Sequence, residues 1–175
     1  DELLAHQTRF GAEGIAVQGD RLWLAMQREW GDDPKGTVKL LAYDMKEKTW
    51  GAVRYPLETP AKGRWMGLSE IQIDGDWAYF IERDNGTGDA AQVKHLTRVP
   101  LAQLQPAPLD GELPVVTKEV VRDLKPDLAR WNGYTAEKVE GFAIDAAGNG
   151  WLVTDNDGVD DSSGETFLWS VGAMR

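Results

Sequence analysis

The sequence predicts an all-β protein built from about three four-stranded antiparallel blades, which would form part of a larger β-propeller ring. Three stretches repeat one plan: a glutamate, a short apolar strand, a turn with Gly, a second apolar strand and a loop rich in Asp and Gly. The repeated glutamates are Glu13, Glu70 and Glu140. Short strands bounded by Gly, Asp and Pro are typical of antiparallel sheets, and a repeated four-stranded unit is typical of a propeller.

The first two repeats are each expected to contain four strands. The first unit spans about 11–56, with strands at 15–17, 22–27, 38–43 and 50–55. The second unit spans about 67–122, with strands at 68–73, 77–82, 94–99 and 115–121. Each strand is rich in apolar, β-branched or aromatic residues and ends at a turn-forming residue.

The remaining segments are an insertion and a shorter third unit. Residues 100–114 contain four prolines, which predicts a surface loop with one helical turn at 101–105. Residues 123–131 are expected to form a short helix. The third unit, about 138–175, offers strands at 140–144, 150–154 and 167–171 and lacks an outer strand.

We interpret residues 1–175 as one partial propeller domain. Propellers usually need about four to eight blades, so the remaining blades would come from sequence outside this chain or from a second copy. The alternative fold is a β-sandwich of about 11 strands.

Composition narrows the possible functions. The net charge of −10 argues against nucleic acid as a partner, because phosphate backbones bind basic surfaces. The chain has no apolar run long enough to span a membrane. It has no cysteine and only two histidines, so thiolate metal sites are excluded and a zinc site built on several imidazoles is not expected.

Carboxylates are expected to gather at one end of the blades. In a hairpin, the start of the first strand and the end of the second lie together. This rule places Glu13 near Arg28, Glu70 near Arg83 and Glu140 near Asp155. The loops after the second strands begin at this same face and are rich in Asp and Gly.

Such a face predicts calcium, which takes about six to eight oxygen ligands. The expected ligands are Glu13, Glu70, Glu140, Asp155 and Asp157. The alternative is that Asp and Gly only form turns, and that Glu13 and Glu70 only pair with the arginines beside them. Glu140 has no arginine at the matching position, so it is the glutamate most expected to face a cation.

Arg28, Arg83 and Glu70 are the candidate catalytic residues. A guanidinium binds phosphate oxygens bidentately, and a metal-bound water could attack the ester. Trp30, beside two aspartates, is the tryptophan expected to touch a ligand. The sequence contains no Gly-x-Ser-x-Gly motif for catalysis by a serine nucleophile. The stretch around Ser69 departs from this motif at its last position, Ile71.

Several phrases resemble the bacterial "esterase-like activity of phytase" family. They are residues 10–16 with 21–28, residues 67–71 with 81–84, residues 138–145, and most specifically residues 155–165. The resemblance covers nearly the whole chain and matches the C-terminal half of that family's domain. It implies a secreted or periplasmic β-propeller that hydrolyses phosphate esters or other esters, and calcium at the channel mouth by analogy with propeller phytases.

Two functional hypotheses follow. The first is a periplasmic or extracellular calcium-dependent hydrolase whose partner is a small phosphate ester or other ester. The second is a non-catalytic propeller that binds a ligand or protein on the same face, with structural calcium or none.

Overall fold

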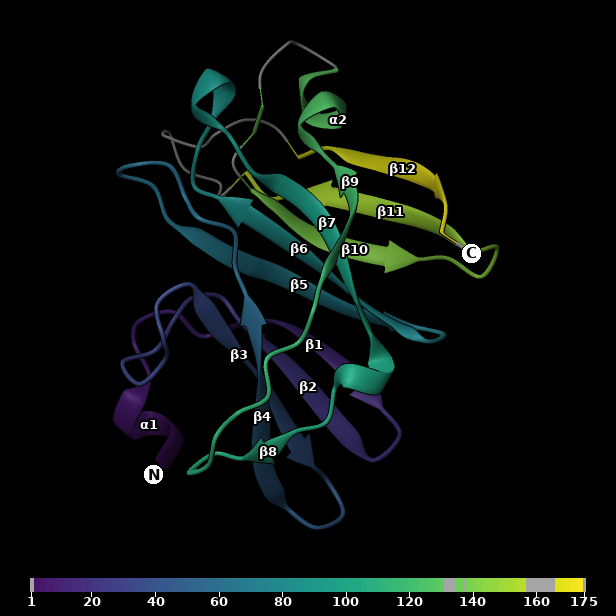
Figure 1. Ribbon diagram of the computed structural model, residues 1–175. Coiled ribbons are helices and arrows are strands. Elements are labelled where there is room, and N and C mark those ends of the chain that lie inside the picture. The colour runs from purple at the N-terminus through teal and green to yellow at the C-terminus, as the bar shows by residue number, and fades with distance from the viewer. Residues whose placement is uncertain (1, 131–134, 137, 157–165, 175) are drawn as a thin grey trace.

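The computed structural model describes residues 2–130, 135–136, 138–156 and 166–174. Its strands form three antiparallel sheets, shown in Figure 1. The first sheet has the order β1-β2-β3-β4-β8 and is preceded by the short helix α1 (Glu2–His6). Its strands are β1 (Ala12–Gln18), β2 (Arg21–Met26), β3 (Thr37–Asp44), β4 (Thr49–Pro56) and β8 (Ala107–Pro108).

The second and third sheets repeat the up-and-down order of the first. The second sheet contains β5 (Met66–Asp74), β6 (Trp77–Asp84), β7 (Lys94–Pro100) and β9 (Glu119–Asp123). The third sheet contains β10 (Val139–Ile144), β11 (Asn149–Thr154) and β12 (Leu168–Ala173). Short helical turns are η1 (Gly88–Ala90), η2 (Leu101–Gln103) and α2 (Lys125–Ala129).

The prediction of an all-β fold is confirmed, and the three sheets fit the blades of a partial propeller. Their first strands, β1, β5 and β10, lie side by side in Figure 1. Within the described residues the sheets do not close a ring, and the extent of the domain stays a prediction. None of the described helices is long and apolar enough to cross a membrane.

The proline-rich insertion differs from its prediction as a surface loop. Ala107 and Pro108 pair with Gly51 and Ala52, which adds β8 to the first sheet. Leu104, inside the insertion, is fully buried. The close approach requires a small partner, because a Cβ at Gly51 would lie 2.8 Å from the Ala107 carbonyl oxygen. Sequence periodicity misses such a contact, because it depends on a strand more than fifty residues away.

The outer strand of the second sheet also differs. A strand was predicted at 115–121, but β9 runs from Glu119 to Asp123. Val115 instead forms an isolated parallel bridge with Arg54 of the first sheet. The segment before β9 therefore still belongs to the first sheet, and the chain then crosses to the second.

The middle sheet is buried on both faces. Phe80 of β6 lies in the core shared with the first sheet, together with Trp23 and Tyr55. Its neighbour Tyr79 lies in the core shared with the third sheet and contacts Phe142 with ring centroids 5.6 Å apart. Successive side chains of a strand point to opposite faces, so β6 supplies both cores and fixes the three sheets around it.

Candidate functional site

Each first strand carries a β-bulge close to its beginning. The pairing register shifts between Ala12 and Gly14, between Leu68 and Glu70, and between Val139 and Gly141. A bulge leaves one extra residue on one strand and re-aims its side chain. The residues at the three bulges are Glu13, Ser69 and Glu140.

The alignment of Glu70 with Glu13 and Glu140 is therefore wrong by one residue. Ser69 occupies the equivalent position in the middle sheet, and Glu70 corresponds to Gly14 and Gly141. A register shift of one residue moves a side chain to the other face of a strand. Spacing along the sequence cannot detect this shift, because it is defined by the partner strand.

Arg83 connects two of these bulges. Its side chain is 1% exposed. Its Nε donates a hydrogen bond to Ser69 Oγ at 2.7 Å, and its Nη2 donates to Glu140 Oε1 at 2.6 Å. The expectation that Glu140 faces no arginine is wrong, because the matching residue comes from the neighbouring sheet. The expected pair of Arg83 with Glu70 is also not formed.

Glu13 completes a group that we call the bulge cluster, which consists of Glu13, Ser69, Arg83 and Glu140. Partial burial and the negative charge of Glu140 raise the pKa of Glu13, and the positive charges of Arg83 and Lys138 only partly oppose this. The bulge cluster thus brings two carboxylates from different sheets together. The expected contact of Glu13 with Arg28 is absent among the described residues.

Glu70 lies between the sheets and has mainly backbone partners. Its Oε1 accepts a hydrogen bond from the backbone N–H of Ile71 at 2.8 Å. Burial raises the pKa of Glu70, and the N–H groups of Ile71 and Phe142 partly offset that effect. A Cβ at Gly14 would lie 2.8 Å from Glu70 Oε1. Glu70 therefore ties β5 to β10, at a point where β1 approaches closely.

Arg28 belongs to a different environment. Its guanidinium carbon lies 4.6 Å from the ring centroid of Phe10 and 5.0 Å from that of Trp65. Arg83 lies over the same Trp65 ring at 5.6 Å. Trp65 is not among the residues predicted from the sequence, although it follows two cations, Lys62 and Arg64, in an acidic chain.

The suggestion that Trp30 touches a ligand stays a prediction: its side chain is mostly buried, yet it lines a pocket of about 240 Å³ with Asp32 and Lys39. Trp30 is 6% exposed and packs in a core cluster with Met26 and Leu41. Its indole Nε1 donates to the carbonyl oxygen of Phe10 at 3.3 Å.

Asp155 lies where the hairpin rule predicts. Its backbone N–H donates to the carbonyl oxygen of Lys138 at 2.8 Å, so it lies at the same end of the third sheet as Glu140. Asp157, the other predicted ligand in this loop, lies outside the described residues.

The described residues do not by themselves fit a calcium site. No group of three or more His, Asp or Glu side chains that could hold a metal ion occurs in the described part of the chain. Glu13 and Glu140 are neighbours, but Arg83 already occupies one oxygen of Glu140. Calcium needs about six to eight oxygens, so any site here would need ligands from outside the described residues.

The fold and the site together define a blade-type all-β domain with acidic and basic groups gathered at the β-bulges of its first strands. The sequence model of the family "Esterase-like activity of phytase" matches residues 2–158, and the chain belongs to this phytase-like family. No curated protein matches the chain significantly. No solved structure matches it significantly.

Proposed function

We propose that this chain is a hydrolase domain for small anionic esters, with phosphate monoesters as the first candidates, and that the bulge cluster is its catalytic centre. The Arg83 side chain, which joins Ser69 and Glu140 at 2.7 and 2.6 Å and acts electrostatically on Glu13 together with Glu140, carries this proposal. Membership of the phytase-like family supports the hydrolase class. Two carboxyl groups in different environments are a common basis for dividing acid and base roles.

The surroundings assign one role to each carboxyl group. Arg83 holds Glu140 by a 2.6 Å charge-assisted hydrogen bond, which fixes the position of this carboxyl group for the role of general base. Burial and Glu140 raise the pKa of Glu13, which suits a general acid. Glu140 would take a proton from water as the water oxygen attacks the ester, and Glu13 would give a proton to the leaving oxygen. Arg83 is a positioning residue in this scheme.

A substrate panel on matched variants tests the proposal. We expect turnover of phosphate monoesters or carboxylic esters by the wild-type chain, and a fall in kcat of about 10²–10⁴-fold in Glu140→Gln. The acid role predicts that activity falls as pH rises through the raised pKa of Glu13, and Glu13→Gln should remove that limb. Glu119→Gln, in an exposed pair with Arg98, is the control. Full turnover by folded Glu140→Gln would refute the assignment.

Calcium dependence is a separate proposal. It rests on the acidic loop that begins at Asp155 and includes Asp157, with Glu13 and Glu140 as further ligands. A ligand bound only by the folded state raises stability by about 2.7 kcal/mol at a hundredfold excess over its Kd. We expect thermal unfolding to shift upward with calcium and not with magnesium. An unfolding midpoint that is the same with calcium and with chelator would argue against calcium binding.

The second candidate function is a non-catalytic binding module, located in the periplasm or outside the cell like the proposed hydrolase. One observation favours it: Arg83 and Glu140 are already paired with one another at 2.6 Å, as groups with a purely structural role are. A lack of turnover across the ester panel, together with saturable ligand binding, would favour this function. Cell fractionation tests the proposed export.

A further inference from the structure

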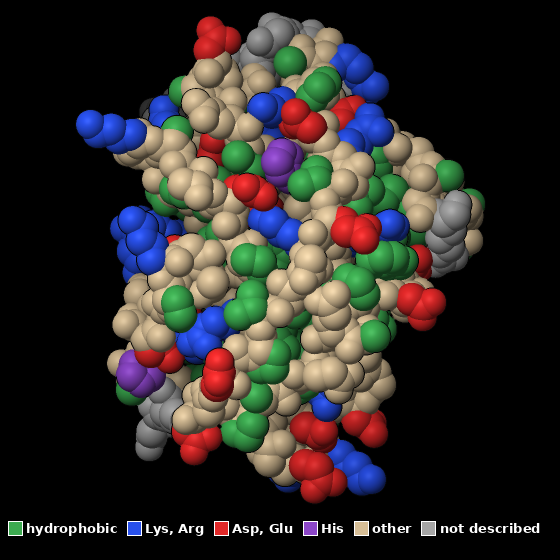
Figure 2. Space-filling view, in the orientation of Figure 1, with side chains coloured by type: hydrophobic (Ala, Val, Ile, Leu, Met, Phe, Trp, Pro, Cys, Tyr) green, Lys and Arg blue, Asp and Glu red, His purple; other side chains and the backbone are tan. Residues whose placement is uncertain are grey.

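A pocket of about 370 Å³ opens between the loop that follows β2 and the loop from β4 to β5. Its lining is mostly apolar, and three cations are placed around it. The residues that matter here are Arg28, Lys35, Leu57, Arg64, Trp65 and Met66. Figure 2 shows Lys and Arg side chains gathered at the edge of the molecule where the loop between β4 and β5 lies.

The lining of this pocket carries more positive than negative charge, with three cations and two carboxylates. Arg28, Lys35 and Arg64 form no ion pair with any described residue. The two carboxylates in the lining are already engaged. Glu29 Oε1 accepts the backbone N–H of Gly36 at 3.1 Å, and Glu58 Oε1 pairs with Lys118 Nζ at 3.2 Å. In a chain of net charge −10, an excess of positive charge around one pocket, on cations that pair with neither carboxylate of the lining, points to an anion.

Arg28 is held in place by stacking and not by hydrogen bonds. Phe10 and Trp65 flank its guanidinium at 4.6 and 5.0 Å. Its Nε is buried and finds no hydrogen-bond partner among the described residues. Stacking fixes the plane of the guanidinium, and its terminal donors remain available for the oxygens of an oxyanion.

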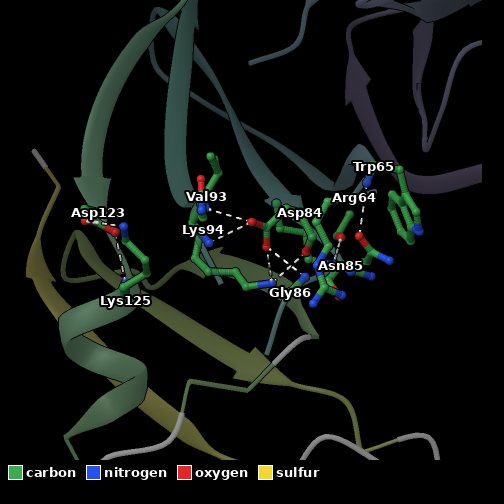
Figure 3. A network of polar contacts seen from close by, with 12 residues as sticks. Arg64, Trp65, Asp84, Asn85, Gly86, Val93, Lys94, Asp123 and Lys125 are labelled. Carbon is green, nitrogen blue, oxygen red and sulfur yellow. Dashed lines mark hydrogen bonds and ion pairs between the residues drawn. The ribbon is translucent and has the colours of Figure 1, made fainter. Parts of the chain in front are cut away.

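The other wall of the pocket is anchored to a buried ion pair, as Figure 3 shows. The backbone N–H of Trp65 donates to Asn85 Oδ1 at 3.0 Å, and Arg64 Nη1 donates to the Asn85 carbonyl oxygen at 3.3 Å. Asp84, the preceding residue, pairs with the fully buried Lys94 at 3.1 Å. A wall fixed in this way loses little entropy when a ligand binds.

We propose that this pocket binds a small organic anion in which a phosphate-type or carboxylate oxyanion is attached to a flat apolar body. Arg28 and Arg64 would grip the oxyanion, since guanidinium groups bind such oxygens bidentately. Leu57, Trp65 and Met66 would contact the apolar body. A pocket of about 370 Å³ is within the range of small-molecule sites. The proposal concerns binding alone and does not depend on the bulge cluster being catalytic.

Binding can be measured without hydrolysis. Phenylphosphonate has a P–C bond in place of the ester bond, and calorimetric titration gives its Kd directly. Benzoate tests the carboxylate version, and methylphosphonate tests the oxyanion without the flat body. We expect saturable binding of phenylphosphonate or benzoate, whichever oxyanion the pocket prefers. Methylphosphonate should bind about tenfold or more weakly, because the apolar contacts are lost.

Matched variants locate the site. Arg28→Met should weaken binding about tenfold or more, and the exposed Arg64→Met provides a second variant if the first does not fold. Arg98→Met is the control, because Arg98 also stacks on a tryptophan, Trp77, at 3.8 Å, but lies outside the pocket. Glu140→Gln should bind phenylphosphonate normally. A lack of ester turnover by the wild-type chain would therefore count against the proposed catalytic role and not against this binding site.

No saturable binding of either aromatic anion to the wild-type chain would overturn the proposal. So would unchanged binding in both Arg28→Met and Arg64→Met, or equal losses in these variants and in Arg98→Met. Methylphosphonate binding as tightly as phenylphosphonate would overturn the role of the apolar wall.

Discussion

Arg28 and Arg83 lie over the same indole ring, at 5.0 and 5.6 Å from the centroid of Trp65, yet their surroundings differ. Arg83 is 1% exposed and donates hydrogen bonds to Ser69 and Glu140. Arg28 lines an open pocket and pairs with no described carboxylate. The two residues look alike in the sequence, since each directly follows a predicted second strand, at 22–27 or at 77–82.

The difference follows from strand register. Arg83 pairs with Gly67 across β5 and β6, which directs it to the bulge of its own sheet and to that of the third. The residue equivalent to Arg83 in the first sheet is Gln27, and Arg28 lies one residue further along. Arg83 therefore holds two sheets together, whereas Arg28 is available to a ligand.

Replacing Arg83 should have the largest effect on stability. Arg83→Met removes two hydrogen bonds and leaves Glu140 without its cation. Breaking a buried ion pair costs about 3–5 kcal/mol, and the 24% exposure of Glu140 argues for the lower end, about 3 kcal/mol. Urea unfolding measures this change. A loss below about 1 kcal/mol, the range of exposed pairs, would contradict the structural role of Arg83.

The second largest loss of stability is expected from a substitution where β1 packs closely against β5. A Cβ at residue 14 would lie 2.5 Å from the backbone nitrogen of Ile71. Gly14→Ala should therefore reduce the free energy of unfolding by about 1–3 kcal/mol. Gly11→Ala is the control, since its Cβ would have a nearest neighbour at 3.7 Å, and we expect a change within about 0.5 kcal/mol. Equal effects would mean that β1 and β5 do not pack as described.

A third prediction concerns pH. The pKa of Glu13 is raised in the folded state by burial and by Glu140, so the folded chain binds more protons than the unfolded chain above pH 4.5. This group therefore adds stability below its unfolded pKa, and that stability is lost as pH rises through the raised value. Glu140→Gln should lower the pKa of Glu13 and so narrow the pH range over which Glu13 adds stability. NMR titration of Glu13 in the wild-type chain and in Glu140→Gln measures this change. An unchanged pKa of Glu13 would mean that the charge of Glu140 does not act on it.

The smallest change in stability is expected for Arg28. Arg28→Met keeps an apolar chain between Phe10 and Trp65 and breaks no ion pair among the described residues. We expect the free energy of unfolding to change by about 1 kcal/mol or less, the size of a partly exposed cation–π contact. A loss as large as that in Arg83→Met would remove the distinction between the two arginines.

The sequence predicted the all-β fold and nearly every strand, because alternation and turn residues are local signals. It did not predict β8, since Ala107 and Pro108 pair with a strand more than fifty residues earlier. The candidate site residues stay predictions, but several of the partners expected for them differ in the structure. Glu140 was expected to face a cation such as calcium, and it meets Arg83 from a neighbouring sheet. Contacts between repeats depend on register, which spacing within one repeat does not reveal.

The most direct test measures both arginines in one experiment. Urea unfolding of wild type, Arg28→Met and Arg83→Met would be followed with and without phenylphosphonate. We predict that Arg83→Met is destabilised by about 3 kcal/mol and keeps the upward shift with ligand, whereas Arg28→Met keeps its stability and loses that shift. The account would be contradicted if both variants lost stability equally, or if the ligand shift disappeared with Arg83 and persisted without Arg28.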